Sequence, residues 1–129
     1  MNQISVIKKI QLGKNGYPID NLFANLNFSF YCGDGKVKHD INLSFQKSKF
    51  LSELIKSGEI TIETLANCQK VKQEDLGNPE KQFLYRYQIY NPVECSNSYL
   101  VIFSIDEYRE YWSCFIYEVL QIERISHTL

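Results

Sequence analysis

The two histidines, His39 and His127, are the residues of this sequence best suited to acid/base chemistry near neutral pH. His39 lies on the apolar side of an alternating stretch, a position typical of a histidine at the edge of a core that makes one hydrogen bond. His127 is third from the C-terminus, where chain ends commonly fray. Neither histidine is therefore predicted to be catalytic.

Four cysteines are candidate nucleophiles or metal ligands: Cys32, Cys68, Cys95 and Cys114. They are far apart and form no Cys-x-x-Cys pair, which favours reduced thiols over a disulfide framework or a metal site. Cys114 is expected on the outer face of a helix beside Glu110 and Glu118, whose carboxylates would raise the pKa of its thiol. Because the sequence also lacks the GxGxxG and GxxxxGK[ST] phosphate loops, we predict a protein that is not an enzyme and needs no metal or cofactor.

The charge distribution narrows the class of partner. A net charge of −1 offers no electrostatic basis for direct nucleic acid binding, although Lys36, Lys38 and Tyr31 form a weak basic and aromatic stripe. Residues 1–56 hold eight lysines against four acidic residues, whereas residues 57–129 hold six basic against eleven acidic residues. The acidic second half is where a partner surface is expected.

Hydropathy gives no reason to expect a membrane partner. No apolar run approaches the length that spans a bilayer, and Lys8 and Lys9 follow the first apolar stretch instead of preceding it as in a signal peptide. We therefore expect a cytoplasmic protein that folds as a single domain over residues 1–129.

The clearest local pattern is a β-hairpin formed by residues 24–32 and 36–45. Apolar residues alternate with polar ones in both segments, which is the period of a half-buried strand. A two-residue turn at Asp34-Gly35 sets the two apolar faces against each other, whereas a shift by one residue would pair an apolar face with a polar one. The predicted pairs are Cys32 with Val37, Phe30 with His39, Phe28 with Ile41, Leu26 with Leu43, and Ala24 with Phe45.

Weaker patterns indicate further elements. Residues 48–57 fit a short helix that Gly58 closes. Residues 83–90 and 99–105 fit two strands, and the second of these, YLVIF, is apolar on both faces and is predicted to be central. Residues 4–12 fit an additional strand. Residues 59–73 suit either a strand or a helix, and we favour the strand.

A C-terminal helix is predicted from residue 104 onward. Ser104 and Glu107 have the spacing of a capping box, with Asp106 and Glu107 in the first turn, where the helix dipole favours negative charge. An apolar stripe then recurs at helical spacing, formed by Tyr108, Tyr111, Trp112, Phe115, Ile116, Val119 and Leu120. We therefore predict an α+β fold: a mainly antiparallel sheet of five to six strands, covered by this helix and the shorter helix at 48–57.

The outer face of that predicted helix supplies the candidate partner-binding residues Glu107, Glu110, Tyr117 and Glu118. Tyrosine provides a large contact area at low entropic cost, and carboxylates favour a cationic partner. An ordinary solvated helix face fits the same composition.

The segment SYLVIFSIDEYREYWSCFIYEVL, with its Asp-Glu-Tyr-x-x-x-Trp pattern, resembles segments of small immunity proteins from bacterial contact-dependent inhibition and polymorphic toxin systems. The resemblance covers 23 of the 129 residues. Such antitoxins commonly block a cognate toxin, often a nuclease, by covering its active site or a nearby surface with acidic and aromatic residues. The resemblance thus implies a cytoplasmic inhibitor that binds a protein toxin stoichiometrically, although this role leaves the lysine-rich hairpin unexplained.

Two alternatives stay open from the sequence. One is a phage-encoded inhibitor of a host defence complex, which gene neighbourhood would distinguish from an immunity protein. The other is a small-ligand-binding or enzymatic domain, which a deep cavity lined by Tyr85, Tyr87 and Phe103 would favour. Neither the partner's identity nor the oligomeric state follows from the sequence.

Overall fold

The computed structural model describes residues 3–21, 25–32, 37–65, 71–76, 78, 80–81, 84–92, 97–109 and 111–123. These residues form a mostly β structure, and the longest helix among them has six residues. None of the helices in these ranges has the length and apolar character needed to cross a membrane. In chain order the elements are β1 (Val6–Lys9), β2 (Gly16–Ile19), β3 (Asn25–Cys32), β4 (Val37–Ser44), β5 (Lys49–Phe50), α1 (Leu51–Lys56), α2 (Ile62–Leu65), α3 (Gln73–Leu76), β6 (Arg86–Tyr90), β7 (Asn97–Tyr108) and β8 (Tyr111–Glu123).

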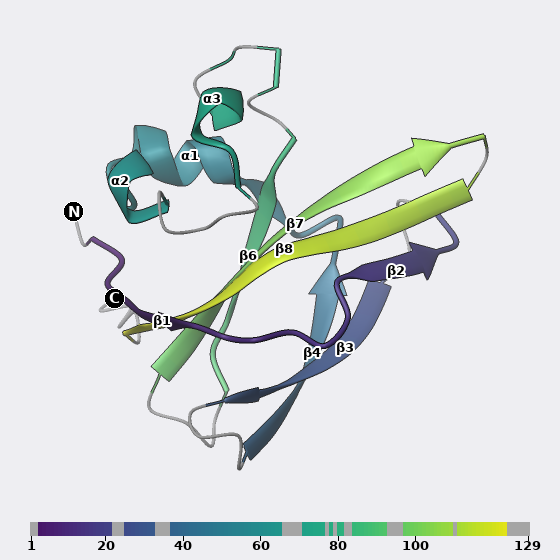
Figure 1. The fold of residues 1–129 in the computed structure, drawn as a ribbon, viewed down its shortest axis with the longest axis horizontal. Helices are drawn as coiled ribbons and strands as arrows, with labels where there is room; N and C mark the ends of the chain where they lie inside the picture. The colour runs from purple at the N-terminus through teal and green to yellow at the C-terminus, as the bar shows by residue number, and fades with distance from the viewer. Residues whose placement is uncertain are drawn as a thin grey trace.

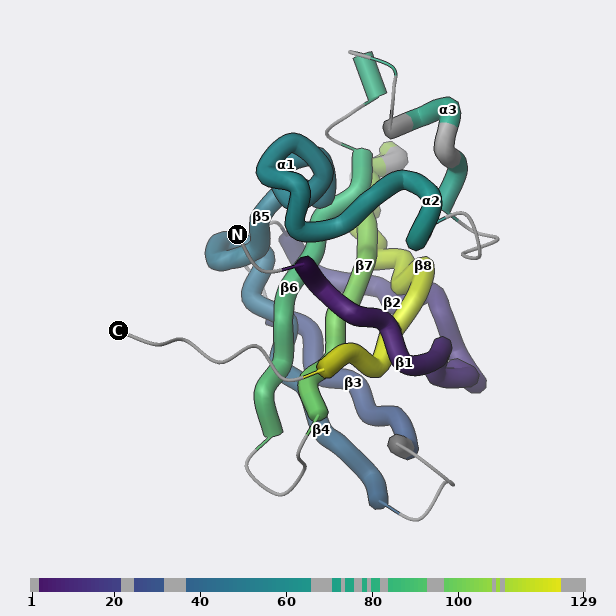
Figure 2. Tube along the Cα trace, turned by 90° about the vertical axis from the view of Figure 1, so that its left-hand side faces the viewer, coloured from purple at the N-terminus to yellow at the C-terminus, as the bar shows by residue number. Residues whose placement is uncertain are grey.

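The main sheet of the described residues has six strands, all of whose pairings are antiparallel. Its order is β1-β8-β7-β6-β5, and β2 also pairs with β8. Figure 2 shows β1 running alongside the end of β8. The segment YLVIF lies in β7 between β6 and β8, which confirms the prediction that it forms a central strand.

Different layers cover the two faces of this sheet (Figure 1). On one face α1 and α2 contribute Leu51, Leu54 and Leu65 to a core with Leu100 and Ile102 of β7. On the other face the separate two-stranded sheet of β3 and β4 contributes a second set of buried side chains. This second core includes Phe28, Phe30, Leu43, Val101, Phe103 and Ile116. Because β7 is buried on both faces, its sequence is apolar at consecutive positions.

The β3–β4 hairpin has the predicted register. Cys32 pairs with Val37, Phe30 with His39, Phe28 with Ile41, and Leu26 with Leu43. The alternation places Phe28, Phe30, Ile41 and Leu43 in the core, so the polar residues between them face solvent. The Asp34-Gly35 turn and the pair of Ala24 with Phe45 lie outside the described residues.

The predicted α+β fold is wrong, because the described residues are mostly β and contain no C-terminal helix. In its place β7 runs through to Tyr108 and β8 occupies residues 111–123. Ser104 is therefore a buried strand residue and not a helix cap. A β-bulge explains the misleading period: Phe103 pairs with Ile116 but Ile102 pairs with Glu118, so Tyr117 is an extra residue in β8.

The bulge and the two covered layers together reproduce the spacing of a helix. Ile116 and Val119 both face the hairpin layer, three residues apart, because the bulge falls between them. Leu120 faces the helix layer from the opposite side of the strand. Residues 111–122 are also rich in aromatic and β-branched residues, which favour a strand.

The other elements differ from prediction mainly in their ends. The short helix is confirmed as α1, and Gly58 follows it with a φ of 80°, a left-handed conformation that glycine adopts without steric cost. The strand favoured for residues 59–73 is wrong, because Ile62–Leu65 forms the helix α2. The predicted strand at 83–90 appears as β6 from Arg86 to Tyr90. The strand predicted at 4–12 is β1, four residues long, and β2 was not predicted.

Candidate functional site

The four predicted partner-binding residues do not share one face, because the helix that would have aligned them is absent. Glu107 is exposed on β7 and pairs with Trp112, whereas Glu118 is half-buried on β8 and pairs with Ile102. These two pairs are five residue steps apart along β7, a distance of roughly 16 Å. Glu110 lies outside the described residues.

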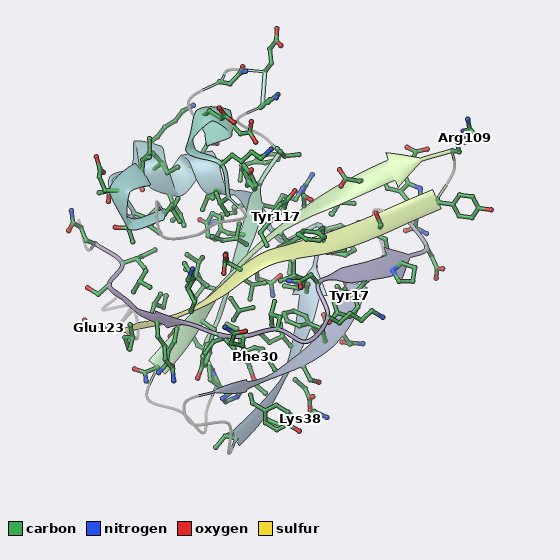
Figure 3. The ribbon with its side chains drawn as sticks, viewed as in Figure 1. Tyr17, Phe30, Lys38, Arg109, Tyr117 and Glu123 are labelled. Atoms are coloured by element: carbon green, nitrogen blue, oxygen red, sulfur yellow. The ribbon has the colours of Figure 1, made fainter. Side chains whose placement is uncertain are left out.

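Tyr117 takes part in packing within the molecule. Its ring lies against Tyr85 with a centroid distance of 4.9 Å and against Phe115 at 4.8 Å. The Ser104 hydroxyl donates a hydrogen bond to the Tyr117 oxygen at 3.1 Å. Tyr85 in turn donates to the buried Asp75 carboxylate at 3.1 Å and accepts from the Lys72 backbone N–H at 3.1 Å. This chain of contacts links α3 to the sheet and leaves Tyr117 half-buried (Figure 3).

Of the residues considered for catalysis, His39 and Cys114 lie in the core, whereas His127, Cys68 and Cys95 lie outside the described residues. His39 is fully buried among the rings of Phe30, Tyr90 and Tyr99, as expected of a core histidine. Cys114 lies on a buried strand face and not on an outer helix face. Burial, together with the nearby Asp106 carboxylate, raises the pKa of the Cys114 thiol to about 12, so the thiol stays protonated near neutral pH.

The cavity suggested for Tyr85, Tyr87 and Phe103 does not form. Tyr85 and Tyr87 belong to the core beneath the helices, whereas Phe103 points to the opposite face of the sheet. The described residues also contain no group of three or more His, Cys, Asp or Glu side chains that could hold a metal ion.

The structure instead presents a projecting arm formed by the end of β7, residues 104–108, and the start of β8, residues 111–115. The arm extends beyond the helices and the β3–β4 hairpin, and of the described elements β2 runs beside it; Arg109 marks its end (Figures 1 and 3). Tyr108 pairs with Tyr111, so only two residues join the strands, and Arg109 has a φ of 49°. Tyr111 is 80% exposed, the most exposed of the large hydrophobic side chains in the described ranges.

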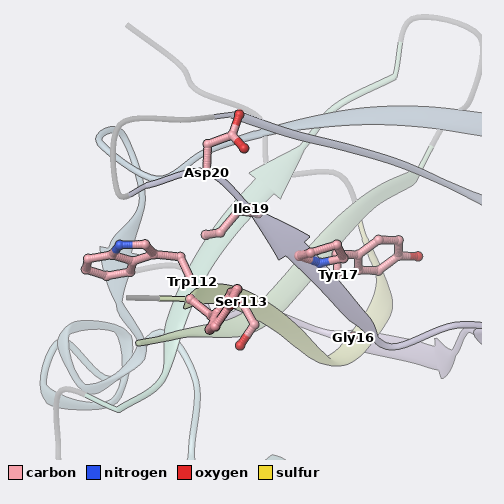
Figure 4. Close-up of a pocket in the computed structure, with 8 residues that line it drawn as sticks. Gly16, Tyr17, Ile19, Asp20, Trp112 and Ser113 are labelled. Atoms are coloured by element: carbon pink, nitrogen blue, oxygen red, sulfur yellow. The ribbon is translucent and has the colours of Figure 1, made fainter. Parts of the chain in front are cut away.

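An open pocket of about 540 Å³ lies where β2 meets this arm (Figure 4). The antiparallel pairing of Ile19 with Trp112 and of Pro18 with Ser113 brings the two segments together. Within the pocket the rings of Trp112 and Tyr17 extend in opposite directions, as Figure 4 shows. The full lining is Gly16, Tyr17, Pro18, Ile19, Asp20, Tyr111, Trp112 and Ser113.

The charges around the arm are mixed but mainly negative. Asp20, Asp106 and Glu107 are exposed. Lys14 lies over the ring of Tyr17, with its Nζ 4.8 Å from the ring centre, so the Tyr17 side of the pocket carries a positive charge. Exposed aromatic rings and arginine are residue types enriched at protein–protein interfaces.

Sequence reasoning missed this surface because it treated residues 104–120 as a helix. As a hairpin, the string Tyr-Arg-Glu-Tyr would have placed two residues in a turn and two tyrosines opposite each other. The contribution of β2 has no local sign in the sequence, since Tyr17 and Asp20 are about ninety residues from Tyr111 along the chain.

Comparison of the chain with known proteins found no matching family model, no matching curated protein and no matching solved structure.

Proposed function

We propose that this chain is a stoichiometric protein-binding protein whose projecting β7–β8 arm contacts its partner. The observation that supports this proposal most is Tyr111, whose ring is 80% exposed at the end of the arm while most other large apolar side chains of the sheet are covered. A large aromatic residue in this position has contact area to offer a partner and no role in the core.

The chemistry around Tyr111 indicates the kind of partner. Tyr, Trp and Arg are the residues that most often dominate binding energy at protein interfaces, and all three occur at the arm as Tyr111, Trp112 and Arg109. The exposed carboxylates of Asp106 and Glu107 favour approach of a cationic surface. Nucleases commonly carry such a surface because they bind phosphates.

The most concrete form of the proposal is an immunity protein that neutralises a cognate toxin. The segment that resembles such proteins, residues 98–120, includes the arm, on which Asp106, Glu107 and Tyr111 are exposed. It forms two strands and not a strand followed by a helix, so what supports the proposal is the surface chemistry. A phage-encoded inhibitor would use the same surface, and the neighbouring genes distinguish the two.

The test is a binding measurement with the product of the neighbouring gene. The two proteins are co-expressed, and the purified pair is studied by light scattering and calorimetry, with a one-to-one complex as the expected result. Tyr111→Ala is expected to weaken the complex at least about tenfold, as for an aromatic residue that dominates an interface.

The matched control is Tyr31→Ala. Tyr31 is also an exposed strand tyrosine, at 56% exposure, but it lies on β3 away from the arm. Its replacement is expected to leave the affinity within about twofold of the wild type, as for a residue outside the interface. Equal affinities for the two variants would contradict a role for the arm.

A further inference from the structure

One edge of the arm has no neighbouring strand among the described residues. Pairing between β6 and β7 ends at Arg86 and Phe103. Beyond that pair, residues 104–108 of β7 are paired only with β8 on their other side, through to Tyr108 and Tyr111. An unpaired strand edge presents a row of backbone N–H and C=O groups that can bind an added strand.

The direction of these backbone groups follows from one contact of β8. The Ile116 N–H donates to the Asn15 carbonyl at 2.8 Å, and the Asn15 side-chain amide donates to the Ile116 carbonyl at 2.9 Å. The backbone groups of Ile116 therefore point away from β7. In an antiparallel pair, the backbone groups of two opposite residues either point toward each other or both point away from the partner strand. Phe103 lies opposite Ile116, so the backbone N–H and C=O of Phe103 point away from β8 and toward β6.

The same alternation assigns the free edge. Backbone direction repeats every second residue, so Ile105 and Glu107 direct their N–H and C=O groups the same way as Phe103, where β6 no longer covers them. Ser104 and Asp106 direct theirs toward β8. The edge thus offers two donors and two acceptors at the spacing of a strand.

We propose that this edge accepts an extended, cationic segment of the partner as an additional β-strand. This inference rests on the proposed function and specifies how the partner is held. Asp106 and Glu107 are both exposed and point to opposite faces of β7, so an added strand with lysine or arginine at consecutive positions meets a carboxylate on each face.

A second copy of this chain is a poor occupant of the edge. Two β7 edges placed antiparallel would bring the Asp106 and Glu107 carboxylates of both copies together, and like charges across paired strands are destabilising. The edge itself contains no lysine or proline, the residues that commonly prevent strand addition. The charge therefore discourages self-pairing and favours a basic strand.

The first test is amide hydrogen exchange followed by NMR. In the free protein, the amides of Ile105 and Glu107 are expected to exchange at least about tenfold faster than that of Asp106, which points toward β8. The probe is a synthetic peptide, acetyl-TVTKRTV-amide, whose adjacent lysine and arginine point to opposite faces of an extended strand, with acetyl-TVTEETV-amide as the matched control. The basic peptide is expected to slow exchange at Ile105 and Glu107, and the acidic peptide is expected to have no effect.

The second test separates the backbone donor from the carboxylate. Glu107→Ala removes only the side chain, and we expect basic-peptide affinity to fall about threefold, as for an exposed ion pair. Glu107→Pro also removes the outward N–H, without removing a bond to β8, and we expect a further loss of about tenfold. Unchanged circular dichroism and melting temperature show that both variants are folded.

Each outcome has a distinct meaning. Equal affinity of the basic peptide for Glu107→Ala and Glu107→Pro overturns the added strand. The inference is also overturned if the Ile105 and Glu107 amides of the free protein become more protected as the protein concentration rises, because this would indicate pairing with a second copy. If the partner complex forms and depends on Tyr111 but not on the Glu107 N–H, the proposed function stands and this inference fails. If no partner protein binds while the basic peptide protects the Ile105 and Glu107 amides, the proposed function fails and the inference that the β7 edge accepts a basic strand is supported.

Discussion

Tyr85 shows how a single residue joins distant parts of this structure. Its hydroxyl donates to Asp75 and accepts from the Lys72 N–H, and Lys81 lies 3.7 Å from the other Asp75 oxygen. Burial, as the largest cause, and the Asp75 carboxylate raise the pKa of Tyr85 to about 12. The folded state therefore holds the Tyr85 proton more tightly than the unfolded chain does.

We predict that Tyr85→Phe lowers the free energy of unfolding by about 1–2 kcal/mol at pH 8, because it removes the hydrogen bond to Asp75 and leaves the Lys72 N–H without its acceptor. The sign of the pH dependence follows from the raised pKa. The stabilisation by the protonated phenol is complete below pH 10 and is lost as the pH rises toward 12. The gap between wild type and Tyr85→Phe is therefore expected to narrow between pH 10 and pH 12 in urea unfolding measurements. A gap that widens over this range would contradict the assignment.

Sequence reasoning at this scale was correct where a residue's surroundings are local. The position of His39 in the core follows from strand alternation and is confirmed. For Cys114 the direction of the pKa shift was right, but the cause was not, since burial and Asp106 replace the expected neighbours Glu110 and Glu118. Glu110 and Glu118 would lie beside Cys114, one turn to either side, only if this segment were a helix.

Among the elements, the β7–β8 hairpin contains the one non-glycine residue in the described ranges with a positive φ, Arg109 at 49°. A side chain in this left-handed region costs about 1 kcal/mol, and glycine avoids that cost.

We predict that Arg109→Gly keeps the free energy of unfolding within about 0.5 kcal/mol of the wild type or raises it, because relief of strain offsets the greater freedom of glycine in the unfolded chain. Arg109→Val, whose branched side chain tolerates this region poorly, is expected to lose at least about 1 kcal/mol. Thermal unfolding of both variants measures the difference. Greater stability of the valine variant would contradict the turn geometry.

The two hairpins show what the sequence determines about elements and what it leaves undetermined. In β3–β4 one face is buried and the other is exposed to solvent, so apolar residues recur at every second position and this pattern specifies the register. In β7–β8 both faces are covered and Tyr117 adds a residue to one strand, so the period of two is lost. Neither the covering layers nor the bulge can be inferred without knowing the neighbouring elements.

At the scale of the whole molecule, the main sheet depends on layers on both of its faces. Ile102 packs beneath the helices, and Phe103, the next residue, packs against Phe45 in the hairpin layer with a centroid distance of 5.9 Å. Both side chains are fully buried.

We predict that Ile102→Ala and Phe103→Ala each lower the free energy of unfolding by about 3 kcal/mol or more, since each leaves a cavity in a separate core. Chemical denaturation of the two variants, compared with exposed Val37→Ala as the control, measures the effect. A loss below about 1 kcal/mol at either position would mean that the corresponding face of the sheet is not covered in solution.

The candidate site is also a property of the whole molecule. Its aromatic residues come from β2 and from the β7–β8 arm, and sheet pairing alone brings Ile19 to Trp112. The acidic second half of the sequence, where a partner surface is expected, contains both strands of the β7–β8 arm. Their placement could not be predicted, since it depends on which segments the sheet sets side by side.

Pro18 makes the two edges of the arm unequal in their capacity to bind an added strand. By the backbone alternation along β8, Pro18 turns its nitrogen to the outer side of β2, and proline has no hydrogen there to donate. A strand added on the β2 side would therefore lack one hydrogen bond that a strand on the β7 side can form. This difference favours a discrete complex with one added strand over continued growth of the sheet through its β2 edge.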